Sequence, residues 1–273
     1  MEDLLPILEH VPQVLLVCAR LAGLVIFAPI LSSIAIPARV SASISFLVGI
    51  AVYPALSVEV FNGQVYELEL LSLVPLLAAE AGIGLAIGWL AMLPLLAAQF
   101  AGMLTGAQLG LGFAEIYNPA TDASADVVAQ MLFWLGLAAF LALSGHVWVV
   151  LAVLRTFDYV PVGGFRVDGD LMDLGAGLLL AAMEVGLRVA APVLAIVFLE
   201  SIAMGFMSRT TPQLNVLSLG FPLRIIVGIG MTAAGLYVIG DVLMVSLHDM
   251  LNAIHLWATD GHESMEGAAL GRR

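Results

Sequence analysis

Long apolar runs separated by short polar stretches dominate the first half of the chain. Two of them cover residues 14–36 and 40–58, and a third covers residues 70–114. A helix needs about 20 apolar residues to cross the hydrocarbon core of a bilayer, so the first run has the length of a membrane helix. The serines of the second run favour close helix contact over lipid exposure. The third run is longer than one straight span needs. Because Pro75 and Pro94 can break it, it predicts either one long kinked helix or a pair of half-helices.

The second half repeats this pattern with fewer interruptions. Apolar runs cover residues 127–154, 174–207 and 225–247, and Pro192 predicts a kink in the middle one. The whole pattern predicts an all-α integral membrane protein with about six to eight long, kinked hydrophobic helices arranged as hairpins.

Composition supports this class. Hydrophobic residues make up 62% of the 273 residues and charged residues only 11%, whereas a soluble domain carries about 25% charged residues. We expect a single helical domain over residues 1–260 and a polar tail over residues 261–273. The net charge of −12 is the opposite of the basic surface that binds nucleic acid.

A few charged residues lie inside the apolar runs, and ionisable groups at membrane depth indicate a function or a contact between proteins. They are Arg20, Glu80, Glu184, Arg188, Glu200 and Asp241. Glu184 and Arg188 are four residues apart with the acid first, which predicts an ion pair on one helix face. Glu200 falls nearly on the opposite face, so we expect it to contact another helix, in this chain or in another subunit.

A glycine-rich segment over residues 106–119 follows the third run. Its glycines propagate a helix poorly, and the residues that follow them carry bulky apolar side chains. One interpretation is a movable pore plug, because hydrophobic constrictions close channels by excluding water. The other is a loop whose aromatic side chains fill the core. The residues concerned are Gly110, Gly112, Phe113, Ile116 and Tyr117.

A second connecting stretch covers residues 207–224. Pro212 and Pro222 are expected to end or restart regular structure, and the apolar residues between them need a cover from water. The stretch predicts either a connector packed on its own bundle or a contact with other subunits. Its distinctive residues are Arg209, Pro212, Gln213, Leu214, Asn215 and Pro222.

Three function classes compete. An enzyme is disfavoured because the chain has no H-E-x-x-H, Walker A or G-x-S-x-G motif. With one cysteine and no fixed set of ligands, we expect neither a metal site nor a cofactor. An ion-coupled secondary transporter accords with proline-broken helices and intramembrane acids. A subunit of a larger membrane channel accounts for the apolar loops that one chain can hardly cover alone.

Several motifs, in order along the chain, carry a resemblance to one family. R-T-T-P-Q-L-N-V and L-G-F-P-L-R lie at residues 209–216 and 219–224, and further matches lie within residues 20–39, 106–119 and 145–161. Together they resemble the FliR family of flagellar type III export-gate proteins. The homologous proteins of virulence type III secretion carry a looser version.

The resemblance implies an all-helical subunit of a conical, multi-subunit export gate in the bacterial inner membrane, at the flagellar basal body. It implies FliP-like and FliQ-like partner subunits, FlhB-like and FlhA-like components around them, and unfolded flagellar proteins as cargo, with no chemistry of its own. It also makes Phe113, Ile116 and Tyr117 the seal of the pore plug, in which Glu115 is an unexpected charge. The alternatives are a virulence export-gate subunit and the ion-coupled transporter.

Overall fold

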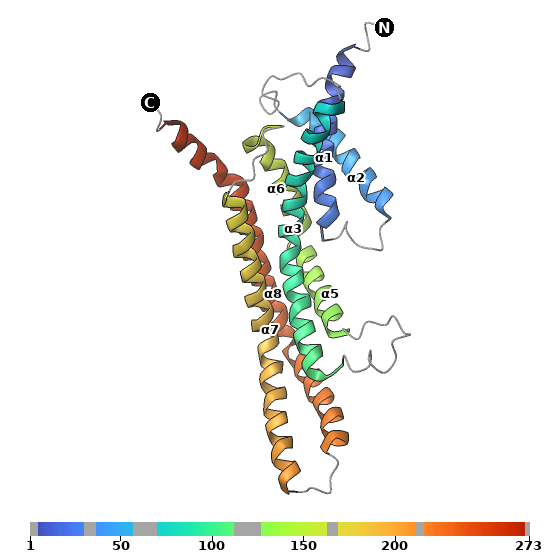
Figure 1. Cartoon of the computed structure of the whole chain (residues 1–273), viewed down its shortest axis with the longest axis vertical. Coiled ribbons are helices and arrows are strands. Elements are labelled where there is room, and N and C mark those ends of the chain that lie inside the picture. The colour runs from blue at the N-terminus through green and yellow to red at the C-terminus, as the bar shows by residue number, and fades with distance from the viewer. Residues whose placement is uncertain are drawn as a thin grey trace. The chain divides into compact units, whose positions relative to one another are not determined.

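The described part of the computed structural model consists of helices and short connections. It covers residues 5–29, 37–56, 70–111, 127–162, 169–210 and 216–270. The helices in Figure 1 are α1 Leu5–Phe27, α2 Ala38–Val52, α3 Leu70–Leu109, α5 Val127–Ala142, α6 Gly145–Tyr159, α7 Gly169–Thr210 and α8 Val216–Leu270, with a 3₁₀ turn, η2, at Tyr53–Ala55. The predicted all-α class is confirmed.

The first predicted helix is displaced toward the N-terminus. α1 begins well before residue 14 and ends at Phe27, where the Ala28 N–H still donates to the Leu24 carbonyl oxygen at 2.9 Å. Pro29 comes next, and proline disfavours the helical conformation of the residue before it. The predicted end at residue 36 lies outside the described residues.

The third apolar run forms one continuous helix. α3 has 40 residues, and both Pro75 and Pro94 lie within it. The interpretation as one long helix is therefore confirmed, and a pair of half-helices is wrong. At about 1.5 Å per residue α3 is about 60 Å long, roughly twice the thickness of a bilayer's hydrocarbon core.

The run over residues 127–154 forms two helices. It is broken between α5 and α6, where Ser144 has a φ of 55° in the left-handed region. The Ser144 carbonyl oxygen accepts hydrogen bonds from the N–H groups of Val147 at 2.9 Å and Trp148 at 3.3 Å. These bonds start α6 afresh, because a left-handed residue cannot continue a right-handed helix.

The described residues of the stretch 207–224 are helical. α7 continues to Thr210 and α8 starts at Val216, so Pro222 lies inside α8 and does not restart it. A proline inside a helix loses one hydrogen bond at a cost of about 3 kcal/mol, which neighbouring contacts must offset. α8 also continues to Leu270.

The chain divides into two compact units. The first comprises Met1–Met92, Ser144–Leu178 and Asp249–Arg273. In it α1 packs against α2, α3 and α6, and the Tyr53 hydroxyl joins η2 to α1 by donating to Gln13 Oε1 at 2.6 Å. The core side chains of these helices include Leu16, Leu21, Ile87, Leu90, Val153 and Phe157.

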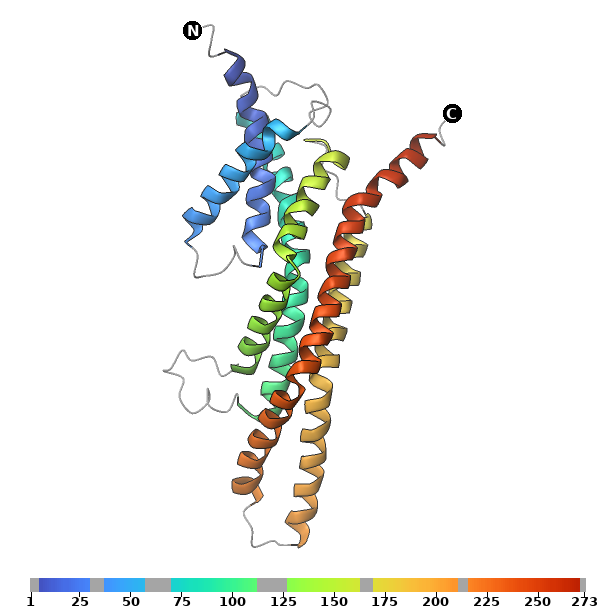
Figure 2. The ribbon, with the colours of Figure 1, turned by 180° about the vertical axis from the view of Figure 1, so that it is seen from behind.

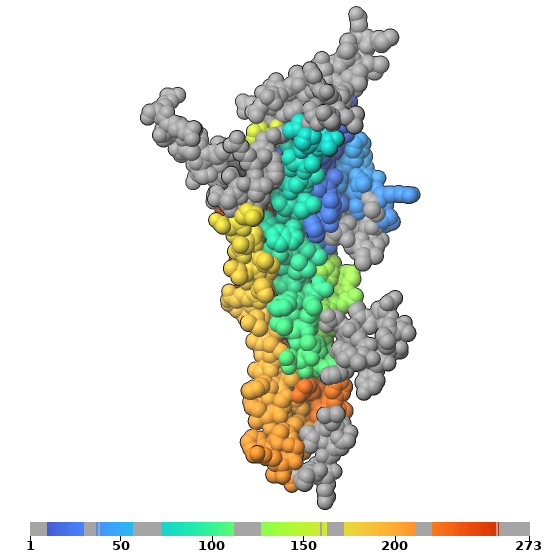
Figure 3. Space-filling model, in the orientation of Figure 1, coloured from blue at the N-terminus to red at the C-terminus, as the bar shows by residue number. Residues whose placement is uncertain are grey.

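The second unit comprises Leu93–Leu143 and Leu179–His248. In both ribbon views the parts of α7 and α8 in this unit run side by side as a hairpin (Figures 1 and 2). The space-filling view shows the α7 part of the hairpin uncovered at the surface, in yellow to orange (Figure 3). Large apolar side chains exposed on this hairpin include Leu180, Leu187, Phe198, Phe206, Ile226 and Val238.

Helix length and composition confirm the membrane class. Among the described residues, four helices are long and apolar enough to cross a membrane: His10–Phe27, Leu73–Leu109, Met172–Thr210 and Gly220–Ile254. The broken pair α5 and α6 adds a fifth if it counts as one span.

Candidate functional site

A fully buried ion pair joins α1 to α3 in the first unit. Arg20 Nε donates to Glu80 Oε2 at 2.7 Å, and both side chains are 0% exposed. Removing two charges from water costs several kcal/mol per ion unless good geometry and further hydrogen bonds compensate. The other contacts of Arg20 therefore decide whether this arrangement is favourable.

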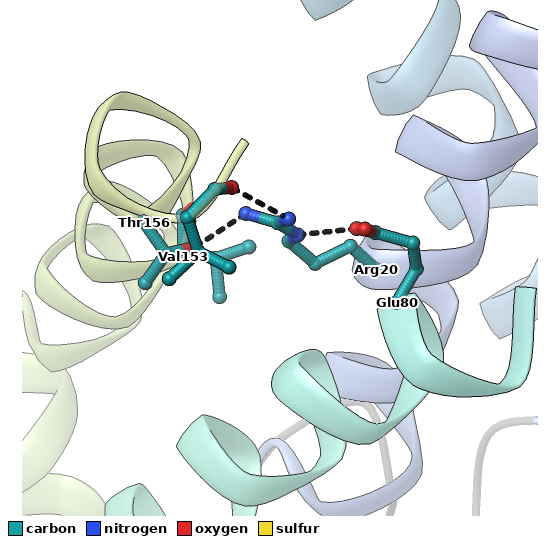
Figure 4. A network of polar contacts seen from close by, with 5 residues as sticks. Arg20, Glu80, Val153 and Thr156 are labelled. Atoms are coloured by element: carbon teal, nitrogen blue, oxygen red, sulfur yellow. Dashed lines mark hydrogen bonds and ion pairs between the residues drawn. The ribbon is translucent and has the colours of Figure 1, made fainter. Parts of the chain in front are cut away.

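α6 supplies those contacts. Arg20 Nη1 donates to Thr156 Oγ1 and Nη2 donates to the Val160 carbonyl oxygen, each at 3.1 Å. The guanidinium carbon also lies 4.0 Å from the centre of the Phe157 ring, a cation–π distance. Thr156 in turn donates to the Val153 carbonyl oxygen at 2.6 Å, as Figure 4 shows. One arginine therefore holds three helices together.

Close backbone packing brings the pair together. A Cβ added at Gly23 would overlap the backbone of Ala81, and one added at Gly84 would overlap the Arg20 carbonyl oxygen. Small residues at these positions let α1 and α3 approach closely enough for the side chains to meet. The sequence identified Glu80 as an intramembrane charge but missed its partner. The available signal was two opposite charges, each alone in an apolar run.

The predicted pair on α7 is confirmed. Arg188 Nη2 donates to Glu184 Oε1 at 2.6 Å across one helical turn, and the two side chains are 64% and 69% exposed. Exposed charges within a candidate membrane span need water or protein beside them, because lipid does not solvate them.

Glu200 contacts another helix, as predicted. Arg224 of α8 donates from Nε to Glu200 Oε2 at 3.1 Å and from Nη2 to Ser201 Oγ at 2.6 Å. The Glu200 side chain is 8% exposed and the Arg224 side chain 34%. This contact is made within the chain, and the sequence did not single out Arg224 as the partner.

The glycine-rich segment is described only at its start. Gly110 has a φ of 75° and directly follows α3. Gly112, Phe113, Ile116 and Tyr117 lie outside the described residues.

The connecting stretch is described only at its two ends. Arg209 is exposed in the last turn of α7, and Pro222 is exposed within α8. The residues between them that the sequence singled out, Pro212, Gln213, Leu214 and Asn215, lie outside the described residues.

No group of three or more His, Cys, Asp or Glu side chains that could hold a metal ion occurs among the described residues. The ion pairs described there are Arg20–Glu80, Glu184–Arg188 and Glu200–Arg224. The first and the third of these pairs join two helices, and the second lies on one helix.

Comparison with known proteins gives a consistent result. The FliR flagellar biosynthetic protein of Escherichia coli (strain K12) is 31% identical over 220 residues, which cover 79% of this chain and 80% of that protein. The FliR protein of Bacillus subtilis (strain 168) is 27% identical over 258 residues, which cover 92% and 97%. The Yop proteins translocation protein T of Yersinia pestis is 26% identical over 175 residues, which cover 63% and 66%.

A known protein family also matches most of the chain. The description "Bacterial export proteins, family 1" matches residues 11–250. This range includes the buried Arg20–Glu80 pair of the first unit and the Glu200–Arg224 pair of the second. The chain therefore belongs to family 1 of the bacterial export proteins.

Proposed function

We propose that this chain is a channel-forming subunit of the flagellar type III protein export gate, in the bacterial inner membrane, and that it does no chemistry itself. The single observation that carries this proposal is the family match over residues 11–250. Several similar proteins bear the name flagellar biosynthetic protein FliR. Unfolded flagellar proteins would be the cargo.

The surface of the second unit supports a multi-subunit setting. The α7–α8 hairpin exposes large apolar side chains such as Leu187 and Phe198 beside the exposed Glu184–Arg188 pair. Lipid could cover the apolar side chains, but the charged pair needs protein or water. FliP-like and FliQ-like subunits, with FlhB-like and FlhA-like components around them, are the proposed partners. The residues 209–222 that carry the family motif are proposed to contribute to these contacts.

The segment that begins at Gly110 is proposed to close the channel. Gly110 and Gly112 start it, and Phe113, Ile116 and Tyr117 supply apolar bulk. A ring of apolar groups stops ion flow by excluding water from a narrow pore. This role needs the assembled complex, because one chain does not enclose the pore by itself.

Two experiments test the subunit role. The first is the native mass of the chain in mild detergent after co-expression with FliP-like and FliQ-like proteins, and we expect one stable large complex. The second is restoration of swimming in a flagellated bacterium that lacks its own FliR protein. A chain that stays monomeric with both partners present, and that restores no swimming, would refute the proposal.

Replacing residues 112–117 by a Gly/Ser linker tests the closing segment. We expect the assembled complex to leak ions, measured as faster collapse of an imposed K⁺ diffusion potential in vesicles. Replacing the same number of residues in the stretch 163–168 is the matched control and should leave the vesicles tight. If the first replacement assembles and stays tight, another part of the complex closes the channel.

A virulence export gate is the second candidate, favoured by the similarity to the Yop proteins translocation protein T of Yersinia pestis. That similarity covers 63% of this chain at 26% identity, against 79% at 31% for the Escherichia coli FliR protein. The swimming assay separates the two candidates.

A further inference from the structure

The last turn of α3 ends in a fixed hydrogen-bonded cap. The Leu111 N–H donates to the Gly106 carbonyl oxygen at 3.2 Å, and the Gly110 N–H donates to the Ala107 carbonyl oxygen at 3.1 Å. Together with the left-handed φ of 75° at Gly110, these two bonds form a Schellman motif, which commonly ends helices. Gly110 is therefore used to stop α3 in a defined geometry.

The Leu109 side chain packs closely against Gly228 of α8. It is 0% exposed. A Cβ added at Gly228 would overlap Leu109 Cδ2 and would lie 3.0 Å from Cγ and 3.2 Å from Cδ1. The absence of a side chain at Gly228 makes the space that Leu109 fills.

Two more helices complete this anchor. Leu109 belongs to a buried cluster with Val128 of α5 and Val193 and Val197 of α7, and Leu111 packs against the same cluster. The residues before and after Gly110 are thus both held by packing. A hinge requires few buried contacts, and the end of α3 has many.

We infer that packing against Gly228 holds the Leu109 side chain in place, so that residues 106–111 stay fixed when the channel opens. Gly110 then ends α3 in a fixed geometry and sets the direction of the chain that follows. Gly228 is a positioning residue for channel closure. This inference rests on the proposed role of the segment after Gly110. It assigns a function to a glycine that lies 119 residues from Leu109 in the sequence (228 − 109).

Thiol labelling tests the fixed position directly. The single native cysteine, Cys18, is first replaced by alanine, and Leu109→Cys is then labelled with a maleimide in the assembled complex. We expect a labelling rate below about a tenth of the rate in denaturant, both with the native segment and with residues 112–117 replaced by the linker. A rise toward the denatured rate on replacement would make Gly110 a hinge and overturn the inference.

Exchanging the side-chain sizes at positions 109 and 228 tests this packing contact. Gly228→Val adds carbons where Leu109 lies, and Leu109→Ala removes them, so the double variant restores the total number of side-chain carbons. We expect each single variant to speed the collapse of the diffusion potential severalfold and the double variant to return most of the way to the native rate. Gly230→Val is the control on the same helix, because nothing lies within 4 Å of its added Cβ, and it should stay tight.

The outcomes are separable. If Gly228→Val fails to assemble, the Leu109→Ala variant decides, because its smaller side chain creates no overlap. A Leu109→Ala complex that assembles and stays tight overturns the inference, as does a double variant that leaks as much as both single variants together. Tight vesicles after replacement of residues 112–117 would instead refute the closing segment of the proposed function, while labelling at position 109 still reports whether the end of α3 is fixed.

Discussion

The Arg20–Glu80 and Glu184–Arg188 pairs join the same two side-chain types in opposite surroundings. The first is completely buried between helices of one chain, and the second is more than three-fifths exposed on a single helix. The candidate spans around them differ in the same sense, because 61% of the α3 span is buried but only 33% of the α7 span and 17% of the α8 span. The buried pair is satisfied within the first unit, whereas the exposed pair on α7 needs water or other subunits beside it.

The largest expected effect is at the buried pair. Arg20→Met leaves the Glu80 carboxylate without its arginine, and breaking a buried pair costs about 3–5 kcal/mol of unfolding free energy. We expect a large drop in the melting temperature of the purified chain, measured by circular dichroism in detergent. The double variant Arg20→Met, Glu80→Leu should recover most of that loss, because it also removes the buried acid. Native-like melting of the single variant would abolish the contrast between the two pairs.

A smaller effect is expected where α1 and α3 touch. A Cβ at Gly84 would overlap the Arg20 carbonyl oxygen, and backbone cannot move aside as a side chain can. Overpacking costs about 1–3 kcal/mol, so Gly84→Val should lower the melting temperature by several degrees. Gly82→Val is the matched control on the same helix, since nothing lies within 4 Å of its added Cβ. Equal melting of the two variants would mean that the close approach is not needed.

The smallest effect on the isolated chain is expected at the exposed pair. A helical pair four residues apart contributes about 0.3–0.5 kcal/mol at the surface, so Glu184→Gln should hardly change melting in detergent. In the assembled complex the same substitution should reduce the fraction of chain that co-purifies with its partners, because the pair is then desolvated. Native mass measurement of both states checks this. An unchanged complex would place the pair against water rather than protein.

Local features could be predicted from the sequence alone. The Glu184–Arg188 pair follows from a spacing of four residues, since such residues face each other on any helix. The long α3 was foreseen as one of two alternatives, but residue composition could not say whether Pro75 and Pro94 would break it. Pro222 misled the prediction, because surrounding contacts decide whether a proline interrupts a helix.

Contacts between distant residues could not be predicted in this way. Arg20 and Glu80 lie 60 residues apart on different helices, and each looked like an isolated charge in its own run. Nothing in the spacing of Leu109 and Gly228 indicates that one fills the space the other leaves. Glu200 was expected to meet another helix, yet only the packing of α7 on α8 selects Arg224.

The sequence by itself determined that this chain is a membrane protein built from long helices. With 62% hydrophobic and 11% charged residues, it has too few polar side chains to form a water-facing surface. Only the tertiary structure decided which of its few charges are paired inside the chain and which remain open to partners. The reason is that burial depends on which helix faces come together, and small residues such as Gly84 and Gly228 set how closely they meet.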